Sequence, residues 1–177
     1  MNNLQKIASA SVFKVMLTRE APEESQEIML EEGLPDGYMD NMVERFFPFI
    51  GPASPNPGDK TSYSAKRGRS MLGSVSIKNT PSGRHEIGVT IAPSHQGKGL
   101  SRVLVDLLMG KHPHDYYDWR CHQDNAKSLK LLQSLGGGLL NIERKPGHVM
   151  LKGLISGQGF INDQMKQRLI EAIERLS

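Results

Sequence analysis

The sequence predicts an α+β fold in which a mixed, largely antiparallel central sheet is flanked by helices. Three β-favouring runs follow one another between residues 61 and 93, and turn signals such as Pro81-Ser82-Gly83 separate them. Helical and β patterns then alternate as far as residue 155, and a last amphipathic pattern follows at 161–176. Strands and helices that are segregated in this way are typical of α+β proteins.

The N-terminal part predicts a strand, two helices and a long loop. Residues 11–17, SVFKVML, show an alternating pattern with apolar, β-favouring residues, which predicts the strand. Residues 21–34 open with Pro22 and two glutamates, which are typical of a helix N-terminus. A second short helix is expected after Asp36, and the prolines and glycines of residues 46–60 predict the loop. The apolar face of that second helix would hold Met39, Met42, Val43 and Phe46.

The remaining elements follow from periodicity and capping residues. Strands are expected at 61–68, 70–79, 84–93 and 116–122, with a helix after Gly97. A further helix, within 124–138, has Asp124 or Asn125 as its N-cap and Gly136 beyond its end. A hairpin closes at Pro146-Gly147. The apolar stripe of the last helix would be buried on its own sheet or on a partner, so a homodimer is possible.

Length, charge and cysteine content indicate one intracellular domain. A chain of 177 residues suits a single domain, and its net charge of +3 mildly favours an anionic ligand without requiring nucleic acid. The single cysteine, Cys121, cannot form an internal disulfide, which favours a reducing, cytoplasmic setting. No signal peptide and no membrane-spanning run is evident. The histidines show no metal-ligand spacing, so no metal is expected.

A glycine-rich turn stands between the strand that ends near Ile91 and the helix that starts near Gly99. The N–H groups at a helix start lack internal partners, and the helix dipole adds partial positive charge, so the turn suits a phosphate. Gly97 and Gly99 would let that phosphate approach the backbone, and Lys98 adds a cation. Taken alone, these residues are equally compatible with a plain glycine turn.

Two segments carry a family resemblance. IAPSHQGKGLSRVLVDLL, residues 91–108, resembles motif A of the GNAT superfamily of N-acetyltransferases, whose hallmark is [QR]-x-x-G-x-[GA]; Ser101 replaces the final small residue. DNAKSLKLLQSLGG, residues 124–137, is similar to the family's N-x-x-A-x-x-L-Y-x-x-x-G-F helix. Residues Asn125, Leu129, Leu131, Leu135 and Gly136 fit that pattern, Ser128 replaces its alanine, and Leu132 stands where it has tyrosine. The resemblance covers about residues 8–155 and implies a single GNAT-like domain over 1–177, extended by the helix at about 161–176.

The resemblance implies an acetyl-CoA-dependent N-acetyltransferase that moves an acetyl group directly to a primary amine of a small molecule or protein. The acceptor would bind between residues 20–60 and the loop before the last strand. The implied cofactor-binding residues are Val89, Thr90, Ile91, Gln96, Gly97, Lys98, Gly99, Leu100, Ser101, Asn125 and Ser128. Helix capping alone is the other explanation for Asn125. Alternative functions are an acetyl-CoA-binding regulatory module with little or no activity, and a transferase acting on a tRNA-linked or protein substrate.

Two residues are candidates for proton transfer. Glu86 is at the head of a strand where the family often has a catalytic base, and its alternative is a solvated carboxylate paired with Arg84 or Lys98. Tyr117 would replace the tyrosine missing at Leu132 as general acid; its alternatives are packing with Tyr116, or protonation of the thiolate by water.

Two other features have simpler explanations. The basic cluster AKRGR, residues 65–69, is expected to be a solvated turn, and its alternative is a contact with an acidic partner or RNA. Cys121 and His122 are neighbours in a predicted strand and therefore point to opposite faces, so Cys121 is expected in the core or in the wall of the site.

Overall fold

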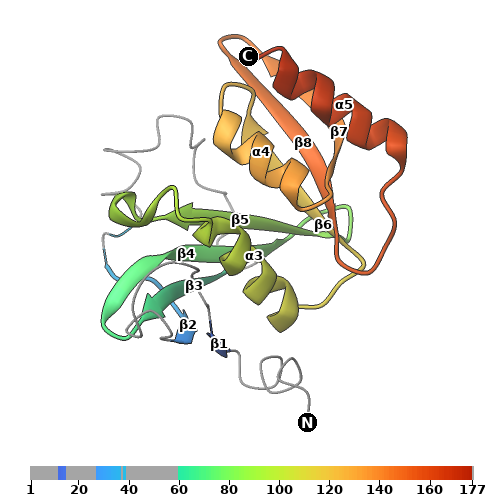
Figure 1. Ribbon diagram of the computed structural model, residues 1–177. Coiled ribbons are helices and arrows are strands. Elements are labelled where there is room, and N and C mark those ends of the chain that lie inside the picture. The colour runs from blue at the N-terminus through green and yellow to red at the C-terminus, as the bar shows by residue number, and fades with distance from the viewer. Residues whose placement is uncertain (1–11, 15–26, 37, 39–59, 177) are drawn as a thin grey trace. The chain divides into compact units, whose positions relative to one another are not determined.

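The structure is a computed structural model that describes residues 12–14, 27–36, 38 and 60–176 (Figure 1). Its residues fall into two compact units. The described part of the first unit consists of residues 12–14, 27–36, 61–77 and 88–113, and the second contains 38, 60, 78–87 and 114–176. The chain passes from one unit to the other within strands β4 (Ser70–Asn79) and β5 (His85–Ile91).

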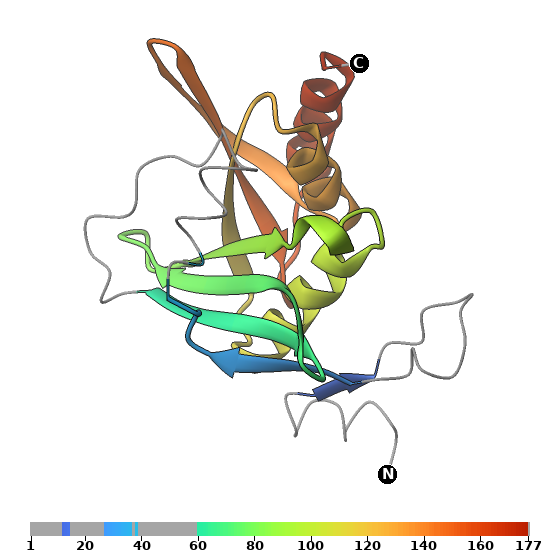
Figure 2. The same ribbon diagram turned by 90° about the vertical axis from the view of Figure 1, so that its left-hand side faces the viewer.

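The first unit is a sheet with one long helix. Its strands lie in the order β1 (Val12–Lys14), β2 (Glu27–Glu32), β3 (Lys60–Arg67), β4 and β5. A short 3-10 helix, η3 (Pro93–His95), follows β5 and leads to helix α3 (Leu100–Lys111). Figure 2 shows α3 along one face of these strands. The helix buries an apolar stripe at Leu100, Leu104, Val105, Leu107 and Leu108.

Strand β2 replaces part of a predicted helix. The helix expected over 21–34 is wrong for residues 27–32, which pair antiparallel with β1 on one side and β3 on the other. Burial alternates along this segment, because Ile28 is fully buried while Met29 is 55% exposed. Hydrogen bonds to two neighbouring strands thus outweigh the helical signal of the glutamates, a tertiary override of local propensity.

The second unit combines the first residues of β5 with the C-terminal elements. Its strands lie in the order β5, β6 (Tyr116–His122), β8 (His148–Ser156) and β7 (Gly138–Lys145). Strand β6 is parallel to β5 and antiparallel to β8, and β7 and β8 form an antiparallel hairpin. The hairpin closes at Pro146-Gly147, as predicted, between the paired residues Lys145 and His148.

Two helices cover strands of the second unit. Helix α4 (Ala126–Ser134) contacts β6, and helix α5 (Asp163–Glu174) contacts β7 and α4. Leu169 in α5 is fully buried, and Ile161 just before it is 3% exposed. The apolar stripe of the last helix is therefore partly buried within its own unit, at Ile161 and Leu169, whereas Leu176 is 40% exposed.

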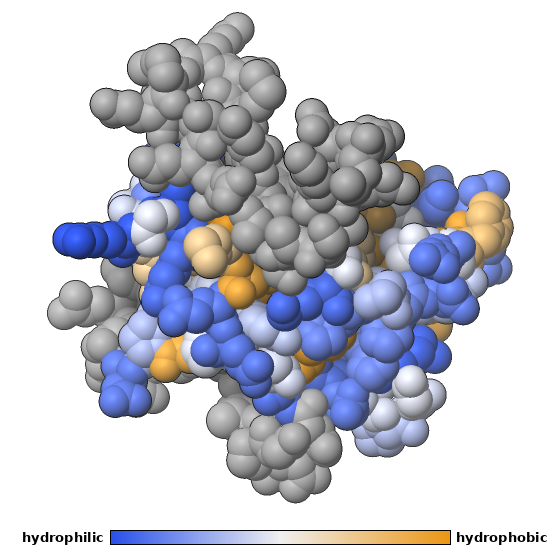
Figure 3. Space-filling model, turned by 90° about the horizontal axis from the view of Figure 1, so that it is seen from below, coloured by the Kyte–Doolittle hydropathy of each residue, from blue (hydrophilic) through white to orange (hydrophobic). Residues whose placement is uncertain are grey.

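The observed elements confirm the predicted fold class, a mixed, largely antiparallel sheet with flanking helices and an extra C-terminal helix. Strands β4 and β6 begin and end at the predicted residues. The second helix expected after Asp36 and the loop at 46–60 fall almost entirely outside the described residues. On the face shown in Figure 3, hydrophilic side chains predominate and apolar ones form only small areas. Within the described part of the chain, no helix combines the length and hydropathy needed to cross a membrane.

Candidate functional site

The glycine-rich turn in the first unit has an uncapped helix start. Gly97 and Gly99 have φ of 76° and 73°, in the left-handed region where a side chain is strained. Gly99 is the N-cap of α3 and, having no side chain, gives the helix no capping hydrogen bond. A side-chain hydrogen bond stabilises the turn, because Nε2 of Gln96 donates to the carbonyl oxygen of Ile91 at 3.1 Å. The first N–H groups of α3 are therefore available to an external acceptor.

The other predicted cofactor positions of this unit surround that turn. Val89, Thr90 and Ile91 form the end of β5, and each is partly exposed. Strand β4 approaches β5 closely here, since a Cβ at Gly73 would collide with the carbonyl oxygen of Thr90. Leu100 is 2% exposed, so its side chain belongs to the core and only its backbone faces the turn.

Basic side chains gather beside the turn. Lys98 is exposed, and Ser101 is partly exposed in the first turn of α3. The pKa of His95 is lowered by burial and then by the positive charges of Lys98 and Arg67. Sequence reasoning missed Arg67, because its cluster, residues 65–69, was expected to be a solvated turn. The signal that could have identified it is the hairpin spacing of β3 and β4, which returns the chain beside the end of β5.

In the second unit, Glu86 lies among charged residues. Its Oε1 is 3.8 Å from Nη2 of Arg120, and 26% of its side chain is exposed. Arg84, the partner suggested by the sequence, instead donates from Nε to Oδ1 of Asp118 at 2.7 Å. Glu86 is therefore a partly solvated carboxylate on β5, paired with a cation that the sequence did not identify.

Tyr117 lies on the opposite face from Glu86. In the parallel pairing of β5 with β6, Tyr117 is opposite His85 and Asp118 is opposite Glu86, and successive side chains of a strand point to opposite faces. Tyr117 is 1% exposed, its hydroxyl accepts a hydrogen bond from the N–H of His114, and burial raises its pKa. The structure does not bring the two candidate proton-transfer residues together. It favours a packing role for Tyr117.

Asn125 and Ser128 are joined by a capping hydrogen bond. Asn125 is the N-cap of α4, and its Oδ1 accepts from the N–H of Ser128 at 3.1 Å. Leu132, at the position of the family's tyrosine, is 1% exposed. It packs so closely against Gly137 and Gly153 that a Cβ at either glycine would collide with it. The position is thus part of the core.

Cys121 is an inert core residue. It is 6% exposed, and burial raises the pKa of its thiol to about 12, so the reactive thiolate is scarce at neutral pH. Its neighbour His122 instead approaches Asp124, with Nδ1 to Oδ2 at 3.6 Å. Among the described residues, no group of three or more His, Cys, Asp and Glu side chains could hold a metal ion.

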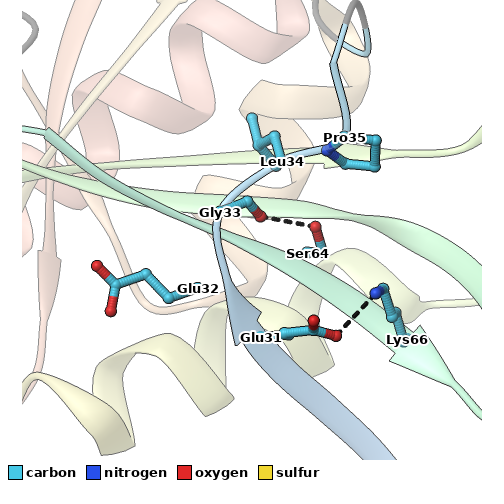
Figure 4. Close-up of a pocket in the computed structure, with 7 residues that line it drawn as sticks. All are labelled: Glu31, Glu32, Gly33, Leu34, Pro35, Ser64 and Lys66. Carbon is cyan, nitrogen blue, oxygen red and sulfur yellow. Dashed lines mark hydrogen bonds and ion pairs between the residues drawn. The ribbon is translucent and has the colours of Figure 1, made fainter.

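A pocket of about 250 Å³ lies at the end of β2, within the first unit (Figure 4). Lys66 donates to Oε2 of Glu31 at 2.7 Å, and Oγ of Ser64 donates to the carbonyl oxygen of Gly33 at 2.7 Å. Glu32 points away from that ion pair (Figure 4). With two glutamates and one lysine, the lining favours cations over phosphates, and the volume is below the usual range for drug-sized ligands.

The predicted site residues divide between the two units. Residues 89–91 and 96–101 belong to the first unit, whereas Glu86, Tyr117, Asn125 and Ser128 belong to the second. The first group forms one continuous turn between a strand end and a helix start. In the second group, Asn125 and Ser128 lie together, and the sides of the sheet separate Glu86 from Tyr117.

A family model and several solved structures that match this chain are those of acetyltransferases. The model of the acetyltransferase (GNAT) family matches residues 22–136. A GNAT family protein from Chromobacterium violaceum is 17% identical, with a TM-score of 0.59 over 78% of this chain and 94% of that chain. The Salmonella typhimurium protein yncA, solved with its cofactor acetyl-CoA, is 16% identical, with a TM-score of 0.57 over 76% and 96% of the two chains.

A third solved structure shows the same likeness. The Bacillus subtilis acetyltransferase in complex with CoA is 18% identical, with a TM-score of 0.53 over 73% of this chain and 97% of that chain. At these identities, the three likenesses establish a shared fold. A search of curated proteins gave no match.

Proposed function

Because the chain belongs to the acetyltransferase (GNAT) family, we propose that it is an acetyl-CoA-dependent N-acetyltransferase that acts on a primary amine of a small molecule or protein. The observation that carries this proposal is the uncapped start of α3, with left-handed Gly97 and Gly99 directly before it. Relatives with this fold hold CoA or acetyl-CoA.

The glycine-rich turn is the proposed pyrophosphate site. The amides of residues 97–101 would donate to its oxygens, and the dipole of α3 and the charge of Lys98 would add to the attraction. Neither Gly97 nor Gly99 has an atom within 4 Å of where a Cβ would be, so the turn has room for the ligand. Backbone groups of Val89, Thr90 and Ile91 would hold the pantetheine arm. Asn125 and Ser128 are proposed separately as cofactor-binding residues.

The proposed reaction is a direct transfer. The neutral amine nitrogen forms a bond to the thioester carbonyl carbon and becomes positively charged. It then loses a proton to water as the carbon–sulfur bond breaks and CoA leaves as a thiolate. Glu86 is the proposed general base that takes the proton of the ammonium form, and its partly exposed carboxylate beside Arg120 supports this assignment. We propose that water protonates the thiolate, since burial keeps the hydroxyl of Tyr117 in the core.

Two variants test these assignments. Glu86→Gln should lower turnover with little change in acetyl-CoA affinity, and an unchanged pH–rate profile in that variant would rule out its role as base. Tyr117→Phe keeps the ring and removes only the hydroxyl, so turnover should stay close to that of the parent. A loss of ~100-fold or more would instead establish Tyr117 as the general acid.

Calorimetric titration with acetyl-CoA tests the whole proposal, and absence of binding at millimolar ligand would reject it. Incubation with acetyl-CoA and a broad panel of primary amines, with release of the CoA thiol as readout, then tests the transfer. Mass spectrometry of a cell extract treated with labelled acetyl-CoA and the pure protein would identify the acceptor.

One observation favours a second candidate function, an acetyl-CoA-binding regulatory module. Leu132 replaces the family's tyrosine and is 1% exposed, so this position offers no proton donor. Acetyl-CoA binding without thiol release across the amine panel would support this candidate over the enzyme.

A further inference from the structure

Arg67 is a partly buried cation, and two of its side-chain donors lack a partner among the described residues. Within the described part of the chain, its Nε and Nη2 are buried and have no hydrogen-bond partner. Burying a charged donor without a partner costs several kcal/mol in a folded protein. Guanidinium groups are therefore normally paired with a carboxylate or a phosphate. The unused donors of Arg67 call for an anion.

The strand that carries Arg67 leads away from the C-terminal end of α3. Tyr63, Ala65 and Arg67 alternate along β3 and therefore share one face of the sheet. At one end of this row, the hydroxyl of Tyr63 is 2.7 Å from Nε2 of His112, the C-cap of α3. Arg67 lies four residues further, ~13 Å along the strand. Arg67 is therefore well separated from His112, at the far end of this row.

Backbone pairing and electrostatics place Arg67 beside the turn before α3. The turn at Gly68-Arg69 joins β3 to β4, and the N–H of Ala92 donates to the carbonyl oxygen of Leu72 at 2.8 Å. The hairpin that carries Arg67 is thus next to the chain that leads from β5 into η3. Arg67 and Lys98 both lie close enough to His95 to lower its pKa. Three basic groups and a helix N-terminus converge here.

We infer that Arg67 binds a phosphate group of the CoA substrate, as a further residue of the site formed by residues 96–101. This inference rests on the proposed function and extends it to a residue outside the family's glycine motif. A guanidinium can donate two parallel hydrogen bonds to one phosphate, which is the geometry that a free Nε and Nη2 offer. CoA presents two such groups, the pyrophosphate and the 3′-phosphate.

Three variants isolate the guanidinium. Arg67→Met removes the charge and retains an apolar stem, and Arg67→Lys keeps the charge without the planar fork. Arg69→Met is the matched control, because exposed Arg69 lies in the same hairpin and its loss changes the net charge equally. Calorimetry would give the affinity of each purified full-length variant for CoA and for dephospho-CoA, which lacks the 3′-phosphate. Thermal unfolding without ligand would report whether each variant is folded.

We expect Arg67→Met to bind CoA ~10- to 100-fold more weakly, Arg67→Lys to be intermediate, and Arg69→Met to be near the parent. Without ligand, Arg67→Met should melt no lower than the parent, because an unpaired cation has been removed; a purely structural arginine would give a lower melting temperature. If Arg67 contacts the 3′-phosphate, only CoA binding weakens. If it contacts the pyrophosphate, CoA and dephospho-CoA binding weaken together.

The outcomes separate the inference from the proposed function. A parent protein that binds no CoA rejects the proposed function. A parent that binds CoA, with both Arg67 variants binding it equally well, overturns the inference alone. Equal weakening by Arg67→Met and Arg69→Met would also overturn it, because net charge would then explain the effect.

Discussion

Among the described residues, the N-termini of helices α3, α4 and α5 are built in two different ways. Helices α4 and α5 each begin with an asparagine whose Oδ1 accepts an N–H, Asn125 from Ser128 at 3.1 Å and Asn162 from Met165 at 2.9 Å. Helix α3 begins after left-handed Gly99, with no side-chain cap. The same chain thus satisfies two helix starts internally and leaves the third available, which is a usual sign that an external group completes it.

The charged groups near these helix starts also differ. At α5 the first turn contains Asp163, an acid that suits the positive end of the helix dipole. The first turns of α3 and α4 contain no acid, and at α3 Lys98, Arg67 and His95 lie close by. Cations at a positive helix end repel each other and the dipole. The arrangement would become favourable with a bound anion, which agrees with the proposed phosphate site at the start of α3.

The largest effect is expected from Gly97→Ala in the turn before α3. An alanine at φ of 76° should cost about 1–2 kcal/mol of stability, and its Cβ should weaken acetyl-CoA binding at least ~10-fold. Gly147→Ala is the control, since its φ of 70° gives similar strain in the turn of the β7–β8 hairpin, which belongs to the second unit. It should lose stability but keep its affinity in calorimetric titrations. If Gly97→Ala and Gly147→Ala lost equal affinity for acetyl-CoA, the start of α3 would no longer differ in function from the other helix starts.

Asn162→Ala should give the next largest effect, on stability only. Loss of the N-cap of α5 should lower the free energy of unfolding by about 1 kcal/mol, as measured by urea unfolding. Acetyl-CoA affinity should not change. If Asn162→Ala weakened acetyl-CoA binding, a capped helix start would also contribute to binding, and this would contradict the contrast with α3.

Asn125→Asp separates capping from ligand contact at α4. Aspartate caps a helix about as well as asparagine, so unfolding in urea should stay within about 0.5 kcal/mol of the parent. If the asparagine amide also donates to the pantetheine arm, acetyl-CoA affinity should fall, because a carboxylate has no N–H. Unchanged affinity would make Asn125 a structural cap like Asn162.

The smallest effect is a pH dependence at His95. Its pKa in the folded protein is below the usual 6.5, so the unfolded chain binds the proton more readily. Stability from this group is therefore fully present above about pH 6.5 and falls as the pH drops below that value. The difference in melting temperature between the parent and His95→Gln should reveal this trend. Binding of acetyl-CoA should raise the pKa of His95 in an NMR titration, because the phosphates offset Lys98 and Arg67; no change would place the phosphates elsewhere.

Local sequence patterns were sufficient to predict several elements of the fold. Strand β6 follows from its alternating residues, α4 from its asparagine cap, and the β7–β8 hairpin from Pro146-Gly147. Strand β2 could not be predicted, because its two neighbours in the sheet come from β1 and from β3, more than thirty residues later. Non-local hydrogen bonds leave little trace in local sequence.

The candidate site follows the same division. The turn at residues 96–101 was predicted from glycines at fixed spacing, and its left-handed conformations agree with that prediction. The ion-pair partner of Glu86 was not predicted, because Arg120 reaches it from a neighbouring strand of the sheet. Arg67 was missed for a similar reason: a basic cluster in a hairpin indicates exposure, and only the pairing of strands brings it beside the turn.

The burial of Cys121 has a practical consequence for assays of this protein. Reagents that colour free thiols are a direct way to follow CoA release, but a reactive cysteine in the enzyme adds a background signal. Here the chain's only cysteine is 6% exposed and has a pKa of about 12. The folded protein should therefore be nearly silent toward such reagents, and a cysteine introduced at the surface would be a unique position for a fluorescent label.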